Sequence, residues 1–335
     1  MEIGILTFHM AHNFGAMLQA YALCSKVRKL AGCSCCIIDY RLPEIYKKYE
    51  ILLKREPVEM KRIKFELFMN HYLNLSPRVM DLYEVPRYDL YIIGSDQIWN
   101  PVITKGYKDE YFGKMFPEDS LCISYGASTG VDIGDWKYLA DKLENIKRIG
   151  VRETWCAENL SRFLKKKVIY CVDPVFLLDT DEWGNLTVDH TGEKYILIYA
   201  FEMYEKEYKE IEEQAEKGGY RIIEIVTHTR DHRNGIIYDV ACGPQEFLGY
   251  MKAADYIYTD SYHGVLFSII FEKKFIYLSR GERNDARVFD VLDQLQLLTD
   301  RAKYIKMTPA GKDILHKYKM ESLTFLEECI CEAKI

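Results

Sequence analysis

Short apolar runs alternate with segments of helical spacing along the first half of the chain. These runs indicate buried strands at Glu2–Phe8, Cys35–Tyr40, Tyr88–Ile93, Leu121–Tyr125, Arg148–Val151 and Val168–Val172. Strands that alternate with helices favour a parallel sheet built from strand–helix–strand units. Asn13 is a predicted N-cap for a helix from about Phe14 to Ala31, and Gly32 stands where a helix commonly ends.

A second series of the same kind occupies the rest of the chain. It predicts strands at Tyr195–Phe201, Arg221–Val226, Tyr256–Thr259 and Phe275–Leu278, and helices near Tyr204–Lys217, Pro244–Ala253 and Ser261–Phe271. The polar stretch Asp179–Glu193 separates the two series. We therefore expect an α/β protein with two Rossmann-like domains, at residues 1–180 and 190–335.

Two further segments carry helical patterns outside these series. Lys54–Asn74 is rich in charge and predicts an amphipathic helical insertion. Lys312–Glu332 predicts a surface helix, which is a candidate to pack back onto the N-terminal domain.

Composition and charge narrow the class of protein. Hydrophobic residues make up 48% of the chain and charged residues 29%, as in ordinary globular proteins. The formal net charge of −6 disfavours a nucleic acid partner, because binding to phosphates needs clustered Lys and Arg. The start of the chain lacks a basic segment, and no stretch reaches about 18 apolar residues, so neither a signal peptide nor a membrane span is predicted. We expect a cytoplasmic protein.

The ten cysteines do not predict a metal site. Cys33, Cys35 and Cys36 lie near Cys24 in the sequence, but they lack the paired C-x-x-C spacing of structural zinc sites. Cys35 and Cys36 also belong to an apolar run, where a free cysteine behaves as a small buried hydrophobic residue. We expect buried thiols.

Small and polar residues follow several predicted strands of the first half. The carboxyl ends of parallel strands meet at one edge of a sheet, where ligands commonly bind. The candidate substrate-binding residues in these loops are Asn13, Gly15, Gly94, Ser95, Asp96, Gln97 and Ser128. Helix capping and tight turns explain the same residues, so the pattern alone leaves both roles open.

Arg152 and Glu153 follow another predicted strand and begin a helix. A guanidinium group in such a place can bind a phosphate or carboxylate through two parallel hydrogen bonds. The alternative is an ion pair, either between Arg152 and Glu153 or between the domains.

The second half presents its candidates in one loop. Asp260, Ser261, His263 and Gly264 follow a predicted strand and open a helix. A histidine there suits proton transfer because its pKa lies near neutrality, although a lone histidine is often structural. The dinucleotide motif G-x-G-x-x-G is missing from the sequence, which disfavours an oxidoreductase, and the Walker A motif is missing as well. The residues alone indicate an α/β ligand-binding enzyme.

Several short motifs occur along the chain. Each is weak evidence alone, but their order and spacing together are specific. Between residues 3 and 280 they are Asn13-Phe-Gly15 with Leu18-Gln-Ala-Tyr-Ala22, Gly94-Ser-Asp-Gln-Ile-Trp-Asn-Pro101, Ser124-Tyr-Gly-Ala-Ser128, Val151-Arg-Glu153, Asp173-Pro-Val175 and Thr259-Asp-Ser-Tyr-His-Gly264. This ordered set resembles the polysaccharide pyruvyl transferase family.

The resemblance implies a two-domain fold like that of glycosyltransferase B enzymes, with a cleft between the domains. It implies transfer of a pyruvyl group from phosphoenolpyruvate to hydroxyls of a sugar or glycan as a ketal, with no metal or other cofactor. His263 would be the proton-transfer residue, and Arg152 would hold the phosphate or carboxylate of phosphoenolpyruvate. The acceptor would be a cell-surface glycan such as an exopolysaccharide, and a lipid-linked acceptor would bring the enzyme to the inner face of the membrane.

Two other functions stay open. A nucleotide-sugar-dependent glycosyltransferase of the same fold would use a nucleoside diphosphate donor, so donor dependence separates it from a pyruvyl transferase. A non-catalytic sugar- or anion-binding protein would bind its ligand but would release no phosphate with any acceptor.

Overall fold

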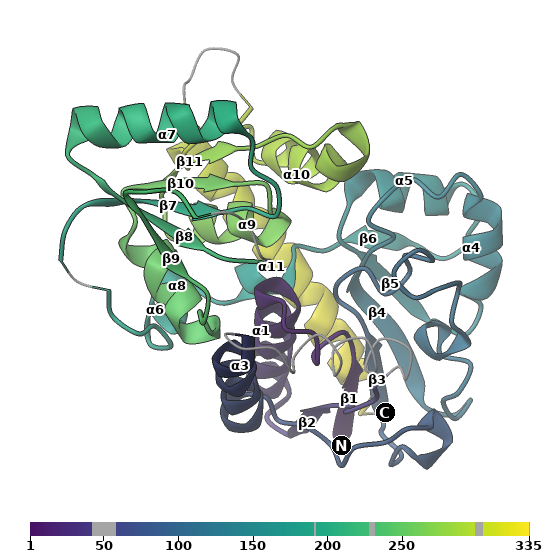
Figure 1. Ribbon diagram of the computed structural model, residues 1–335. Coiled ribbons are helices and arrows are strands. Elements are labelled where there is room, and N and C mark those ends of the chain that lie inside the picture. The colour runs from purple at the N-terminus through teal and green to yellow at the C-terminus, as the bar shows by residue number, and fades with distance from the viewer. Residues whose placement is uncertain (42–57, 191, 228–231, 299–303, 335) are drawn as a thin grey trace. The chain divides into compact units, whose positions relative to one another are not determined.

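The computed structural model describes residues 1–41, 58–190, 192–227, 232–298 and 304–334, which form two parallel sheets and their helices (Figure 1). The chain divides into two compact units, each with one of the sheets. The first unit consists of Met1–Ile51, Met69–Leu178 and Ile314–Ile335, and the second of Leu52–Phe68 and Asp179–Asp313. Each unit thus includes sequence from the far side of the predicted boundary at Asp179–Glu193.

The first sheet has six parallel strands in the described part of the chain, in the order β2-β1-β3-β4-β5-β6. The strands are β1 (Glu2–Leu6), β2 (Ser34–Ile37), β3 (Leu90–Ile93), β4 (Leu121–Ala127), β5 (Arg148–Val151) and β6 (Val168–Tyr170). The apolar runs of the first half predicted all of these strands. Every residue of β3 is buried, as expected for a central strand that is covered on both faces.

The first long helix begins and ends where its capping residues predict. In α1 (Phe14–Ala31), Asn13 Oδ1 accepts a hydrogen bond from Ala16 N at 3.1 Å. Gly32 follows with a φ of 59°, in the left-handed region that favours glycine, and donates its N–H to Arg28 O. Shorter helices of this unit are α4 (Trp136–Lys142), α5 (Thr154–Ser161), η1 (Leu82–Glu84), η2 (Asp109–Phe112) and η3 (Pro174–Leu177).

Two helices extend beyond the alternating series. The helix α3 (Val58–Tyr72) corresponds to the charged segment predicted at Lys54–Asn74, of which residues 54–57 lie outside the described residues. The C-terminal helix α11 (Pro309–Glu332) contacts the first unit, where Val172 N donates to Ser322 Oγ at 3.0 Å.

The second sheet has five parallel strands among the described residues, in the order β11-β10-β7-β8-β9. The strands are β7 (Tyr195–Tyr199), β8 (Arg221–Ile225), β9 (Ile236–Asp239), β10 (Tyr256–Thr259) and β11 (Lys274–Tyr277). The helices of this unit are α6 (Thr180–Gly184), α7 (Glu205–Gly218), α8 (Pro244–Ala253), α9 (Tyr262–Ile270) and α10 (Glu282–Gln294). Figure 1 shows α7 on one face of this sheet and α8 and α9 on the other. The edge strand β9 was missing from the prediction.

Each sheet carries its own apolar core. In the first unit the core includes Trp99, Phe112 and Ile149, and in the second Ile198 and Ile211 pack between the sheet and α7. Among the described residues, no helix is both long enough and apolar enough to cross a lipid bilayer.

Candidate functional site

The carboxyl-terminal edge of the first sheet gathers polar residues from three neighbouring strands. Because β3, β4 and β5 are adjacent and parallel, the residues that follow them meet at the same edge. Ser128 N donates to Asp96 O at 3.0 Å, and Arg152 N donates to Ala127 O at 3.3 Å. The structure thus brings the predicted residues of three separate motifs into one cluster.

Arg152 lies at the centre of this cluster and is surrounded by carboxylates. Its Nη1 donates to Asp173 Oδ2 at 2.7 Å, while Nε lies 3.4 Å from Glu153 Oε1 and Nη2 lies 3.6 Å from Asp96 Oδ1. The Arg152 side chain has no exposed surface. If all four groups are ionised, one positive charge faces three negative charges, so the cluster is net negative.

Two side-chain oxygens in the cluster are buried without a hydrogen bond inside the described structure. Ser128 Oγ donates to Glu153 Oε1 at 2.6 Å, but Glu153 Oε2 has no such partner among the described residues. The same holds for Ser95 Oγ within the described ranges. Glu153 and Ser95 are 1% and 0% exposed, and a buried polar atom without a hydrogen bond costs about 1–3 kcal/mol.

The other predicted residues of the first unit have structural roles in their loops. Asn13 caps α1, and Gly15 is buried in the first turn of that helix. Gly94 has a φ of 118°, and an added Cβ would lie 2.4 Å from Tyr125 O, so the backbone itself requires glycine there. Gln97 accepts a hydrogen bond from Asn100 Nδ2 at 2.9 Å, which steadies the loop after β3.

In the second unit, His263 lies in the first turn of α9, directly after β10. Ser261 caps this helix by accepting a hydrogen bond from Gly264 N at 3.3 Å. The His263 ring packs edge-on against Tyr262 at a centroid distance of 5.2 Å, and only 7% of the residue is exposed. An added Cβ on Gly264 would lie 2.2 Å from Thr259 Oγ1, so this glycine lets the helix start close to the strand.

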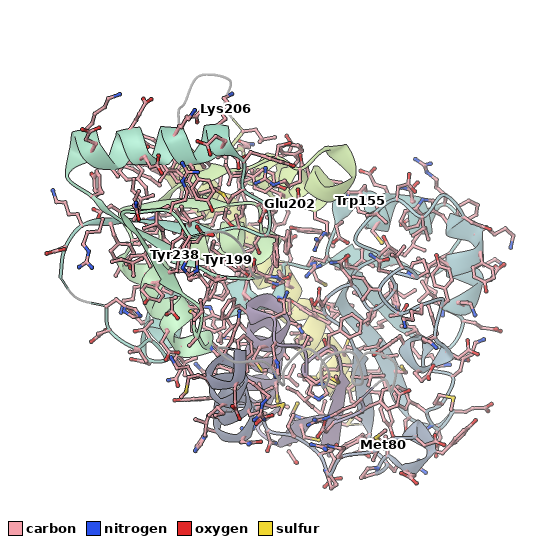
Figure 2. The ribbon with its side chains drawn as sticks, in the orientation of Figure 1. Met80, Trp155, Tyr199, Glu202, Lys206 and Tyr238 are labelled. Carbon is pink, nitrogen blue, oxygen red and sulfur yellow. The ribbon has the colours of Figure 1, made fainter. Side chains whose placement is uncertain are left out.

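Below this turn, the sheet presents a buried tyrosine, Tyr199, which is labelled in Figure 2. Burial raises the pKa of Tyr199, although a hydrogen bond with Ser261 opposes the shift. The phenol therefore stays protonated and polar beneath the N-terminus of α9. On the other side of Tyr262, the Arg287 guanidinium lies 5.0 Å from the centre of the ring.

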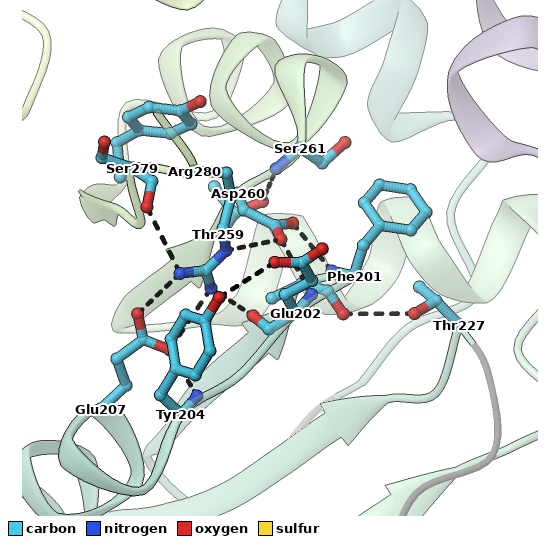
Figure 3. Close-up of polar contacts among 12 residues, drawn as sticks. Phe201, Glu202, Tyr204, Glu207, Thr227, Thr259, Asp260, Ser261, Ser279 and Arg280 are labelled. Atoms are coloured by element: carbon cyan, nitrogen blue, oxygen red, sulfur yellow. Dashed lines mark hydrogen bonds and ion pairs between the residues drawn. The ribbon is translucent and has the colours of Figure 1, made fainter. Parts of the chain in front are cut away.

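Asp260 ties together the loops that follow three strands of the second sheet (Figure 3). Its carboxylate accepts hydrogen bonds from Phe201 N at 2.8 Å and Glu202 N at 2.9 Å, both after β7. It also accepts one from Arg280 Nε, after β11, at 3.2 Å. Only 3% of the Asp260 side chain is exposed. These contacts assign Asp260 to the loop architecture.

Arg280 is a site residue that the sequence analysis missed. It donates to Glu207 Oε1 at 2.8 Å, and its guanidinium lies 5.1 Å from the centre of the Tyr204 ring. Burial lowers the pKa of Arg280, but hydrogen bonds to Glu207 and Asp260 outweigh this effect, so the net pKa is raised. Its place shortly after a predicted strand, at the same edge of the sheet as Asp260, is the sequence feature that could have identified it.

A second missed group lies at the end of β1. His9 Nε2 is 2.9 Å from Asp39 Oδ1, and His9 Nδ1 is 3.1 Å from Thr7 O. Arg41 holds the same carboxylate through Nε at 2.7 Å and Nη2 at 3.0 Å. Both ring nitrogens of His9 therefore lie within hydrogen-bond distance of oxygen atoms of the protein. His9 is fully buried, and its contacts within the protein indicate a structural role for this group.

These observations define an α/β protein with parallel-sheet units and polar clusters at the carboxyl edges of the strands. The model of the family described as polysaccharide pyruvyl transferase matches residues 13–282. The chain therefore belongs to this family of transferases, as the ordered motifs predicted. No curated protein matched the chain.

Solved structures similar to the chain have the glycosyltransferase B fold. A putative UDP-N-acetylglucosamine 2-epimerase from Listeria monocytogenes gives a TM-score of 0.51 at 9% identity, over 99% of this chain and 91% of that one. The Arabidopsis thaliana protein UGT89C1 in complex with UDP gives 0.52 at 12% identity over 100% of both chains. UDP-GlcNAc 2-epimerase from Neisseria meningitidis, bound to UDP-GlcNAc, gives 0.50 at 14% identity over 98% and 94%. At these identities the likeness concerns the fold, and the predicted fold class is confirmed.

Proposed function

We propose that this protein transfers the pyruvyl group of phosphoenolpyruvate to two hydroxyls of a sugar in a glycan, as a cyclic ketal. The observation that carries the proposal is the family match together with the motif at Thr259–Gly264, which lies within the matched residues. Phosphoenolpyruvate is a cytoplasmic metabolite, so we propose that the reaction takes place in the cytoplasm, with a free or lipid-linked acceptor.

The reaction needs proton transfer at carbon and departure of an anion. Protonation of the methylene carbon of phosphoenolpyruvate develops positive charge at C2, to which a sugar hydroxyl adds. Phosphate then leaves with the electrons of its C–O bond, and a second hydroxyl adds to the same carbon. The two sugar hydroxyls lose two protons in all. One offsets the proton added to the methylene carbon, and the other is carried away by phosphate.

In this scheme His263 is the acid that protonates the methylene carbon. Histidine suits the role because its ordinary pKa lies near neutrality, so it can both give and recover a proton.

We further propose that the carboxylate cluster of the first unit binds sugar hydroxyls. Its net negative charge opposes an anionic donor, whereas carboxylates accept hydrogen bonds from neutral hydroxyls. Glu153 Oε2 and Ser95 Oγ, both buried and without a hydrogen bond inside the described part of the chain, supply the acceptor and donor that a hydroxyl needs.

This proposal changes the role of Arg152. The family resemblance implies that Arg152 holds the donor, but its guanidinium is buried against Asp173, Glu153 and Asp96. We propose that it positions Glu153 and offsets the charge of the cluster.

The test is a transfer assay with carbon-13-labelled phosphoenolpyruvate and a panel of cell-surface oligosaccharides. The expected products are a ketal carbon, seen by NMR, and one phosphate for each ketal formed. His263→Gln should lower turnover by at least about a hundredfold, which is within the usual contribution of a general acid. The matched control is His316→Gln on the exposed surface of α11, which should keep full turnover. Equal turnover in both variants would remove His263 from the mechanism.

A further inference from the structure

A cavity of about 600 Å³ opens between α7 and the strands β10 and β11 of the second unit. Three tyrosines line it, Tyr220, Tyr256 and Tyr304, together with α7 residues that include Glu210, Glu213 and Gln214. Small-molecule sites in proteins typically measure roughly 300–1,000 Å³, so the volume suits a ligand of several linked rings. We call this cavity the tyrosine pocket.

The tyrosine rings form walls at nearly right angles to one another. The Tyr256 ring stands between the other two, with its centroid 5.6 Å from that of Tyr220 and 5.8 Å from that of Tyr304. The interplanar angles are 86° and 73°. All three residues are only partly buried, so ring surface remains for a ligand. Flat aromatic surface of this kind packs against the C–H faces of sugar rings.

A glycine makes room for one of these walls. Gly218 ends α7, and an added Cβ there would lie 2.1 Å from Tyr220 Cε2. The bare backbone therefore lets the Tyr220 ring fold back over the end of the helix.

The charges around the tyrosine pocket balance one another. Glu210 and Glu213 contribute two negative charges, and Lys217 and Lys274 contribute two positive ones. Lys217 Nζ lies 3.5 Å from Glu213 Oε2, and Lys274 Nζ lies 5.2 Å from the centre of the Tyr256 ring. Because neither sign dominates, the pocket favours a neutral ligand over a phosphate or a carboxylate.

Polar groups are available to recognise such a ligand. The carboxylates of Glu210 and Glu213 accept hydrogen bonds from hydroxyls. Gln214 Oε1 accepts a hydrogen bond from Tyr258 OH at 2.8 Å, and this bond does not use the amide nitrogen of Gln214. Acceptors, a donor and aromatic faces together are the means by which proteins bind neutral carbohydrate.

The tyrosine pocket lies at the opposite edge of the sheet from His263. Tyr256 and Lys274 are the first residues of β10 and β11, whereas His263 comes after the last residue of β10. With a rise of about 3.3 Å per residue, the two ends of β10 are roughly 10 Å apart. A ligand in the pocket would leave the proposed donor site open.

We propose that the tyrosine pocket is a separate binding site for a neutral oligosaccharide segment. A polymeric acceptor held there would be retained near the enzyme, since a second point of attachment raises its effective concentration. Binding does not require pyruvyl transfer and can be measured without a donor, so this inference and the proposed function fail independently.

The test is saturation-transfer NMR of the full chain with cellotetraose, maltotetraose and mannotetraose, in the absence of phosphoenolpyruvate. We expect at least one tetrasaccharide to bind. Tyr220→Ala should weaken that binding about three- to tenfold, as expected for the loss of one aromatic contact. Gly218→Ala, which displaces the same ring without removing it, should weaken binding in the same direction.

The controls separate this site from others. Tyr83→Ala removes a tyrosine that is 77% exposed in the first unit and should leave binding unchanged, as should His263→Gln. Thermal unfolding shows which variants are folded, and Tyr304→Ala replaces Tyr220→Ala if the latter is not. The proposal is overturned if no tetrasaccharide binds the wild type, or if folded pocket variants bind as well as the wild type does.

Discussion

Replacement of Arg152 by methionine tests the carboxylate cluster most sharply. The substitution keeps an unbranched side chain but removes the guanidinium that bonds Asp173 at 2.7 Å and faces Glu153 and Asp96. The side chains of Arg152 and Asp173 are both 0% exposed, so water cannot replace the lost contact. Removing one partner of a buried ion pair typically costs about 3–5 kcal/mol, and we expect a loss of this size in the free energy of unfolding.

Arg148, the first residue of β5, offers a matched control close to Arg152 in the sequence. Arg148 Nη1 bonds Glu328 at 2.8 Å, a length close to that of the buried pair, but the two side chains are 37% and 56% exposed. Arg148 Nε also bonds Glu332 at 2.7 Å. Each exposed pair contributes about 0.2–1 kcal/mol, so Arg148→Met should cost no more than about 2 kcal/mol. The difference between the two variants comes from burial rather than from bond length.

Urea unfolding followed by tryptophan fluorescence measures both variants. Three of the four tryptophans, Trp99, Trp136 and Trp155, belong to the first unit, so a Trp183→Phe background restricts the signal to that unit. The expected loss moves the midpoint down by about 1–3 M urea. Adding Asp173→Asn to Arg152→Met should recover part of the loss, because it removes one unpaired charge. Equal destabilisation by Arg152→Met and Arg148→Met would show that burial does not set the strength of these ion pairs.

Three further predictions concern other parts of the chain. Burial raises the pKa of Asp39, but hydrogen bonds from its buried histidine and arginine partners outweigh this and hold the pKa below the usual range. The ionised Asp39 therefore stabilises the fold fully above an unfolded-state pKa of about 3.9, and this stabilisation is lost as the pH falls. Urea titrations in acid should show a larger loss of unfolding free energy for the wild type than for Asp39→Asn. Arg280→Gln should speed hydrogen exchange of the two amides that Asp260 holds, and unchanged exchange would contradict its role. Gly264→Ala should lower the unfolding temperature because its Cβ meets Thr259 Oγ1, and Thr259→Ala should relieve that overlap.

The sequence predicts well what is decided by neighbours along the chain. Runs of apolar residues predicted the strands of the first sheet, and Asn13 and Gly32 predicted the ends of α1, because capping is a local hydrogen bond. The strand β9 (Ile236–Asp239) was not predicted because it is short and only Ile236 is buried. An edge strand of this kind lacks the continuous apolar run of a central one.

Pairings between distant residues explain what the sequence could not predict about the site. Arg152 was a candidate anion-binding group because it follows a predicted strand and begins a helix, yet its partner Asp173 lies 21 residues away. Asp260 was a candidate ligand group, but the amide of Phe201 that it holds is 59 residues away. Which side chain meets which at a sheet edge depends on strand order, and strand order is set by the whole fold.

Calorimetric titration measures whether the protein binds phosphoenolpyruvate, the proposed donor. The purified protein is titrated in parallel with phosphoenolpyruvate, UDP-N-acetylglucosamine and NADH, as wild type and as His263→Gln. We expect the wild type to bind phosphoenolpyruvate and the variant to bind it more weakly, with no binding of the other two compounds. Binding of UDP-N-acetylglucosamine without binding of phosphoenolpyruvate would show that the proposed donor is wrong and would indicate a nucleotide-sugar enzyme.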